Sequence, residues 1–143
     1  MTQTSTTFFP LTNEPAIDGL IGGSYWNLGA DRTLTWSIAS PYYTWSDAGY
    51  EALQYAFKAW EEVINVNFEY TGHYTDFRTA PADIAVTLLD NRFFGDSSFA
   101  GLAVFPYKPF ADSFAESHGE TSTSYSHPEG DIFFNIDNPI FNW

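Results

Sequence analysis

Residues 44–70 read TWSDAGYEALQYAFKAWEEVINVNFEY, and this stretch decides the fold. Apolar residues recur in it at helical spacing and predict one apolar stripe, which consists of Leu53, Ala56, Phe57, Trp60, Val63 and Ile64. Ser46 or Asp47 can begin the helix, because a short polar side chain there accepts hydrogen bonds from free amides of the first turn. An amphipathic helix needs an apolar surface to cover, so we expect the rest of the chain to supply a sheet.

Five segments have the composition of β-strands. They are residues 33–38 (TLTWSI), 66–71 (VNFEYT), 83–89 (DIAVTLL), 101–105 (GLAVF) and 131–135 (DIFFN). Alternation in the first places Leu34, Trp36 and Ile38 on one face. The third is apolar and β-branched, as in a strand covered on both faces. The order strand, helix, strand, further strands predicts an α+β or α/β-like sandwich with the helix crossing one face.

Length and composition fit a single globular domain. The chain has 143 residues, of which 44% are hydrophobic and 20% aromatic, so aromatic side chains must supply much of the core. The 18 acidic residues outnumber the 5 basic ones, and the net charge of -13 argues against a nucleic-acid partner because such a surface repels phosphates. No apolar run has the ~20 residues of a membrane span. Residues 1–16 are expected to be a flexible lead-in without the features of a signal peptide.

Metal-ligating side chains are few. The chain has no cysteine, so any metal must be held by histidines and carboxylates. The three histidines, each expected in a loop, are His73, His118 and His127. The last two flank a polar tract and could meet at a metal, although ordinary surface positions explain all three. Oxygen ligands for calcium could come from Asp90, Asp96, Asp131 and Asp137, but their spacing matches no EF-hand.

No pattern of catalytic side chains is present. The sequence has neither a G-x-S-x-G turn nor a glycine-rich phosphate loop, and we assign no catalytic residue. A hydrolase using two carboxylates would need a pair of acids facing one cleft, which the sequence cannot place. Residues 107–129 are rich in Ser, Thr, Gly and Pro, and we expect a functional or mobile loop that contributes nothing to the core.

A backbone site is the remaining candidate. Residues Ala100, Gly101 and Ala103 alternate with larger ones, and small side chains on an exposed strand let another backbone approach, as in strand addition. A tightly packed core strand would show the same pattern, so composition leaves both interpretations open.

The order of these segments resembles a known family. Residues 33–38, 52–70, 82–90, 100–106 and 129–135 together resemble the N-terminal half of the metzincin zinc endopeptidases, the serralysin branch most and the matrixins second. The similarity runs from about residue 17 to the end. Its most specific parts are F-x-x-W-x-x-V at 57–63, A-D-I at 82–84 and G-D-x-x-F-N at 130–135.

The resemblance implies a fold and a binding site. It implies a twisted five-stranded sheet in which four strands are parallel, with one long helix on one face and the 101–105 strand antiparallel at the edge. In the family this edge pairs with an extended peptide or protein substrate. The implied substrate-binding residues are therefore Gly101, Leu102, Ala103 and Val104, through their backbones.

The resemblance also implies chemistry that this sequence does not carry. In the family, a later helix with H-E-x-x-H-x-x-G-x-x-H holds zinc, and its Glu is the general base. These 143 residues contain no such motif, so we expect an extracellular, substrate-facing half that is inactive without the C-terminal half of the protease domain. Apolar residues at Val104, Phe133 and Phe134 make a matrixin-type structural zinc unexpected. The alternative is a non-enzymatic, acidic, secreted peptide- or protein-binding module.

Overall fold

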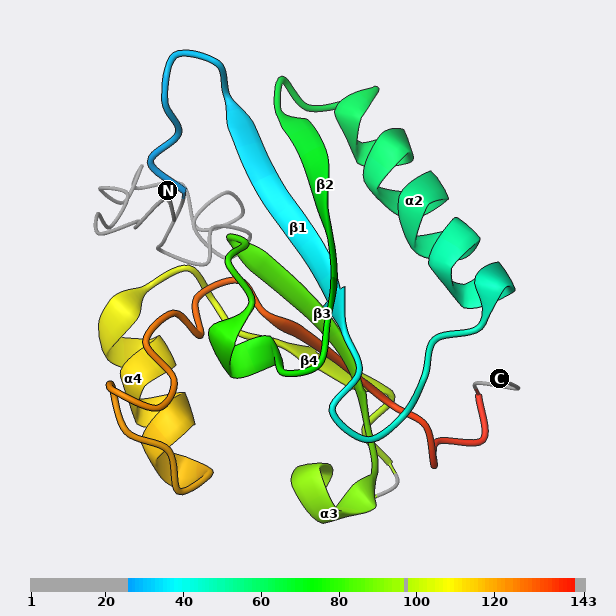
Figure 1. The fold of residues 1–143 in the computed structure, drawn as a ribbon, viewed down its shortest axis with the longest axis vertical. Coiled ribbons are helices and arrows are strands. Elements are labelled where there is room, and N and C mark those ends of the chain that lie inside the picture. Colours follow the sequence, from blue (N-terminus) through cyan, green and yellow to red (C-terminus); the bar gives the residue numbers. More distant parts are fainter. Residues whose placement is uncertain (1–25, 97, 141–143) are drawn as a thin grey trace, which may run out of the picture.

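The computed structural model describes residues 26–96 and 98–140, and the predicted lead-in 1–16 lies outside them (Figure 1). The elements follow the predicted order of strands and add three helical segments. They are β1 (Thr33–Ala39), α2 (Asp47–Glu61), β2 (Asn67–Tyr74), the 3-10 helix η1 (Phe77–Thr79), β3 (Ile84–Leu89), α3 (Asn91–Phe94), β4 (Gly101–Ala103), α4 (Lys108–Ser117) and β5 (Ile132–Asn135). None of the helices in these ranges has the length and apolar composition of a membrane span.

The strands form one mixed sheet in the order β2-β1-β3-β5-β4. β1 pairs in parallel with β2 and β3, and β3 pairs in parallel with β5. β4 is antiparallel to β5 and occupies the edge. The protein is therefore an α+β protein with a five-stranded, mostly parallel sheet and an antiparallel edge strand, as predicted.

Helix α2 covers one face of the sheet. Ser46 is its N-cap, with Oγ accepting a hydrogen bond from the Gly49 amide at 3.1 Å, which confirms one of the two predicted caps. Below the helix, the Trp36 ring stacks on Phe57 with centroids 4.4 Å apart and contacts Tyr70 at 4.7 Å. As predicted, Leu34, Trp36 and Ile38 share this face.

The predicted apolar stripe of α2 is wrong at four of its six positions. Leu53 and Phe57 are half-buried, whereas Ala56, Trp60, Val63 and Ile64 are exposed. The helix ends at Glu61, whose carboxylate accepts a hydrogen bond from the Phe68 amide of β2 at 2.7 Å. The last two residues of the stripe therefore follow the helix.

The opposite face corrects the expectation for residues 107–129. This segment contains α4, and Figure 1 shows α2 and α4 on either side of the sheet. Ala111, Ala115 and Tyr125 are buried in a core cluster with Phe77 and Phe133. Two alanines four residues apart lie on one face of the helix, so their small side chains allow close approach to the sheet. The sheet is thus covered by a helix on both faces, and not by one helix on one face.

The central strand β3 confirms the prediction of a strand covered on both sides. All six of its residues are buried. Ala85 and Leu89 belong to the cluster beneath α4, and Ile84, Val86 and Leu88 belong to the cluster beneath α2.

Candidate functional site

The edge strand β4 holds three of the four predicted binding residues. Gly101 and Ala103 are exposed and Leu102 is half-buried, while Val104 follows the strand and is buried in the core. β5 is the one strand hydrogen-bonded to β4 in the described sheet, with Leu102 opposite Phe133. The other side of β4 is therefore an open sheet edge.

Hydrogen bonds to β5 alternate along this segment. The Val104 amide donates to the Asp131 carbonyl at 2.8 Å, and the Ala100 carbonyl accepts from the Asn135 amide at 2.9 Å. In an antiparallel pair, alternate residues direct their N–H and C=O groups to the partner strand. Residues 100, 102 and 104 face β5 in this way, so Gly101 and Ala103 direct their backbone groups outward.

These outward groups define what strand addition would use. The pairing with β5 uses the backbone groups of Leu102 and Val104, so the N–H and C=O groups of Gly101 and Ala103 point away from β5. Both backbone groups of Val104 are already bonded, because its carbonyl accepts from the Gly130 amide at 2.9 Å. Gly101 and Ala103 therefore each direct one donor and one acceptor away from β5. Leu102 pairs with β5, and Val104 is packed in the core.

Exposed phenylalanines flank β4 in the sequence or contact one that does. Phe99 precedes β4, Phe105 follows it, and Phe110 contacts Phe105 with ring centroids 5.7 Å apart. Each of the three side chains is about half exposed, at 51%, 53% and 47%. We name these three residues the aromatic rim. These three residues were not predicted, although Phe99 and Phe105 lie close to the small residues of the strand in the sequence.

Gly101 is required by the close approach of β5. A Cβ atom added to it would lie 2.7 Å from the Phe133 carbonyl oxygen, nearer than a Cβ atom approaches a backbone oxygen without displacement. The glycine thus allows the edge strand to sit against β5.

Asn135 at the end of β5 fixes the entrance to β4. Its fully buried Nδ2 donates to the Asn91 Oδ1 atom and to the Phe99 carbonyl, both at 2.9 Å. These bonds join β5 to α3 and to the loop that leads into the edge strand. They hold the position of Phe99 in the aromatic rim.

Asp131 fixes the other end of β4. Its buried carboxyl group accepts hydrogen bonds from the Ala85 amide of β3, at 2.6 Å, and from the Tyr125 hydroxyl. Burial raises the pKa of Asp131 well above its ordinary value, although both hydrogen bonds favour the charged form. Glu129 is buried as well, so these two neighbouring acids are enclosed and do not face a cleft.

An open edge with two free backbone pairs and an aromatic rim has the geometry of a strand-addition site. Comparisons with protein-family models, curated proteins and solved structures give no match to this chain.

The histidines lie apart from this site and have other contacts. His73 belongs to β2 and not to the predicted loop, and its Nε2 lies 2.7 Å from the Ser40 hydroxyl. His118 ends α4 and stacks on Phe93 with centroids 4.4 Å apart, while His127 is exposed. Among the residues that the structure describes, no three His, Asp or Glu side chains are grouped as a metal site.

The four proposed calcium ligands each have a different protein partner. Asp90 accepts from Arg92 and from the Tyr43 hydroxyl, and Asp96 accepts from the Ser98 amide. Asp137 accepts from the Asn91 amide, and Asp131 is enclosed in the core. The structure therefore uses these carboxylates to fix loops and the sheet.

Proposed function

We propose that β4 binds an extended peptide by strand addition, and that the chain is the substrate-binding half of a serralysin-like metzincin zinc endopeptidase domain. The outward N–H and C=O groups of Gly101 and Ala103 carry this proposal. The sheet supports it, because four parallel strands with an antiparallel edge strand are the arrangement that the resemblance implies.

Strand addition at this edge gives weak, backbone-directed binding. Gly101 and Ala103 together offer two donors and two acceptors, and a hydrogen bond contributes about 0.5–1.5 kcal/mol net. The cost of ordering the peptide offsets part of this sum. Apolar peptide side chains gain further free energy against the aromatic rim, which gives a preference for peptides with large apolar residues.

The described residues do not fit a zinc ion. No suitable group of three ligands exists among them, and Val104 and Phe133 are packed in the core. In a complete enzyme of the family, zinc polarises the water that attacks the peptide bond. In our proposal this chain holds the substrate in an extended conformation, and the metal comes with a segment that is not among these residues.

Amide NMR spectra test the docking. We expect an unstructured peptide such as Ac-Ala-Phe-Ala-Phe-Ala-NH2 to shift the Gly101 and Ala103 amides. A peptide N-methylated at alternate residues should not bind, because it lacks the donors that face β4.

A proline substitution gives the matched variant. Ala103→Pro removes an outward N–H that β5 does not use, and proline is tolerated at such edge positions. We expect this variant to fold and to lose peptide binding. Unchanged binding by Ala103→Pro, or equal binding of the methylated peptide, would contradict strand addition.

Two further observations separate the protease half from the binding module. We expect the purified chain to hydrolyse no casein and to bind no stoichiometric zinc, and chelator-sensitive proteolysis would contradict this. An in-frame H-E-x-x-H in the coding sequence beyond residue 143 would support the protease domain, and a stop codon there would favour the module.

A further inference from the structure

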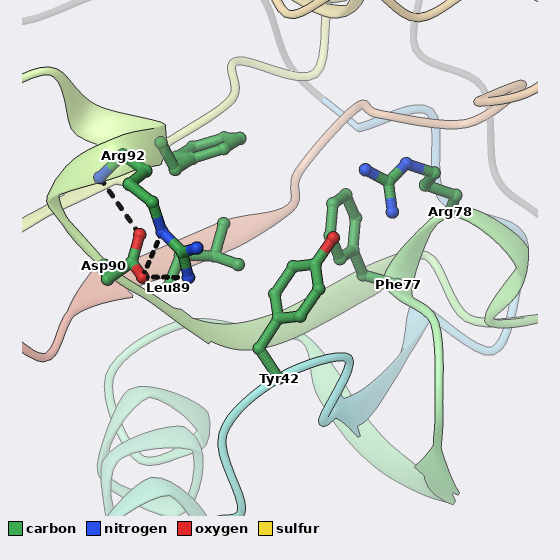
Figure 2. Close-up of a pocket in the computed structure, with 7 residues that line it drawn as sticks. Tyr42, Phe77, Arg78, Leu89, Asp90 and Arg92 are labelled. Atoms are coloured by element: carbon green, nitrogen blue, oxygen red, sulfur yellow. Dashed lines mark hydrogen bonds and ion pairs between the residues drawn. The ribbon is translucent and has the colours of Figure 1, made fainter.

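Apart from β4, a depression lies at the carboxyl ends of three parallel strands. It has a volume of about 350 Å³, and its lining residues are Leu89, the last residue of β3, and residues that follow β1, β2 and β3 in the chain. Figure 2 shows six of the seven by label, and the full lining is Tyr42, Phe77, Arg78, Leu89, Asp90, Arg92 and Phe93. We call this depression the carboxyl-end crevice.

The topology of the sheet opens the crevice at this place. After β1 the chain crosses to the face covered by α2, whereas after β3 it crosses to the face covered by α4. β1 and β3 are neighbours in the sheet, and the connections that follow them leave toward opposite faces. Open sheets of parallel strands bind ligands at such a switch point, outside the carboxyl ends of the strands.

Two guanidinium groups flank the crevice. Figure 2 shows Arg78 and Arg92 on opposite sides, with Tyr42 and Phe77 between them. They are two of only five basic residues in a chain with a net charge of -13. The crevice wall itself contains a single acid, Asp90. Two of the five basic residues therefore line one crevice, and each is paired with at least one acid.

Both arginines are held in place by acids at their flanks. Arg92 donates through Nε and Nη2 to Asp90 Oδ2, at 2.8 and 2.6 Å, and its side chain stays 82% exposed. Arg78 donates through Nε to Glu120 at 2.6 Å and through Nη1 to Asp76 at 3.2 Å. No partner is assigned to Arg78 Nη2 within the described parts of the chain. The guanidinium groups are thus oriented in advance, as recognition of an anion requires.

Aromatic rings supply an apolar wall. The Arg78 guanidinium lies over the Phe77 ring, 4.5 Å from its centroid, and Tyr42 is 67% exposed. An adjoining hollow of about 390 Å³ shares Phe77, Arg78, Arg92 and Phe93 with the crevice and extends to His118. A ligand can therefore place a planar apolar group against the rings while its charge meets an arginine.

We propose that the carboxyl-end crevice binds a small organic anion, a carboxylate carried on an aromatic group. The carboxylate would lie between Arg78 and Arg92, and the ring would lie against the exposed Tyr42 and the half-buried Phe93, because Phe77 is buried and Arg78 covers its ring. This site is separate from β4, and the proposal does not depend on peptide docking there.

Titration with phenylacetate, followed by amide NMR, tests the proposal. We expect saturable shifts for Tyr42, Phe77 and Phe93, and at least tenfold weaker binding of phenylacetamide, which has the same shape without the charge. Absence of saturable shifts at about 10 mM phenylacetate, equal affinity for the amide, or shifts confined to other residues would overturn the proposal.

Variants that remove a charge provide a second test of anion binding in the crevice. Arg92→Gln removes a mostly exposed side chain, so the protein should fold and bind phenylacetate at least tenfold more weakly. Arg78→Gln should have the same effect on binding. Lys58→Gln on α2 removes the same charge away from the crevice and should leave the affinity within twofold. Equal losses in Arg92→Gln and Lys58→Gln would show a general charge effect and would also overturn the proposal.

Discussion

The Tyr125 hydroxyl donates a hydrogen bond to the Asp131 carboxyl group, and both side chains are buried. The pair joins the segment after α4 to the residue that precedes β5, directly behind the edge strand. Because the same carboxyl group accepts the Ala85 amide, three parts of the chain meet at Asp131. Its protonation is therefore coupled to the packing that holds β4 in place.

Asp131 should make the folded protein less stable as the pH rises. Its folded-state pKa is raised, so this group contributes most stability below the unfolded pKa of about 3.9, and that contribution falls as the pH rises toward the folded pKa. In the wild type, the free energy of unfolding should fall above pH 4 with a slope that approaches about 1.4 kcal/mol per pH unit. We expect Asp131→Asn to remove this fall. Urea unfolding between pH 4 and 8 measures this.

Tyr125→Phe is the matched variant for this effect. It removes a hydrogen bond that favours the charged carboxyl group, so the decline with pH should persist while the overall stability drops by about 1–3 kcal/mol. Parallel stability curves for the wild type and Asp131→Asn would show that Asp131 does not take up a proton on folding.

The packing of α4 can be tested at Ala111, which is fully buried. Ala111→Leu adds a large side chain to a filled site, and we expect a loss of about 1–3 kcal/mol in the free energy of unfolding. Ser113→Leu adds a leucine to an exposed position of the same helix and should change the stability by less than about 0.5 kcal/mol. Equal effects in thermal or urea unfolding would argue against a core role for this helix.

Asp90 should titrate near pH 2. Hydrogen bonds from Arg92, and then from Tyr43, lower its pKa to about 2, so its contribution to stability is present above about pH 4 and is lost as the pH falls toward 2. In Tyr43→Phe the carboxyl pKa should rise, as carbon-detected NMR can measure. Tyr42→Phe changes the neighbouring tyrosine, which does not contact Asp90, and should leave the titration in place. No change in Tyr43→Phe would rule out this hydrogen bond.

Strong periodicity made most of the sheet predictable. The β-branched, apolar composition of β3 indicated a strand covered on both faces, and the alternation in β1 placed Trp36 under the helix correctly. The pattern could not show how far α2 remains in contact with the sheet. Trp60 and Ile64 are as apolar as Phe57, yet both are exposed: Trp60 lies in the last turn of the helix, and Ile64 follows its end at Glu61.

Helix α4 was missed because its polar residues dominate the composition. The signal was present, since Phe110, Ala111, Phe114 and Ala115 recur at helical spacing after Pro109. The outward direction of the Gly101 and Ala103 backbones could not be predicted, because it depends on the register with β5. The carboxyl-end crevice was also out of reach, because three segments far apart in the sequence, a loop, η1 and α3, bring Tyr42, Arg78 and Arg92 together.

The fit of β4 against β5 depends on the missing side chain of Gly101. In Gly101→Ala, the new Cβ would lie 2.7 Å from the Phe133 carbonyl oxygen, so β4 must move away from β5. We expect a loss of about 1–3 kcal/mol in the free energy of unfolding and faster hydrogen exchange at the Leu102 and Val104 amides. Ala103→Val enlarges an exposed residue of the same strand and should keep the wild-type exchange at both amides. If the two variants exchange equally fast, the contact with Phe133 does not fix the edge strand, and the outward register of β4 loses its physical basis.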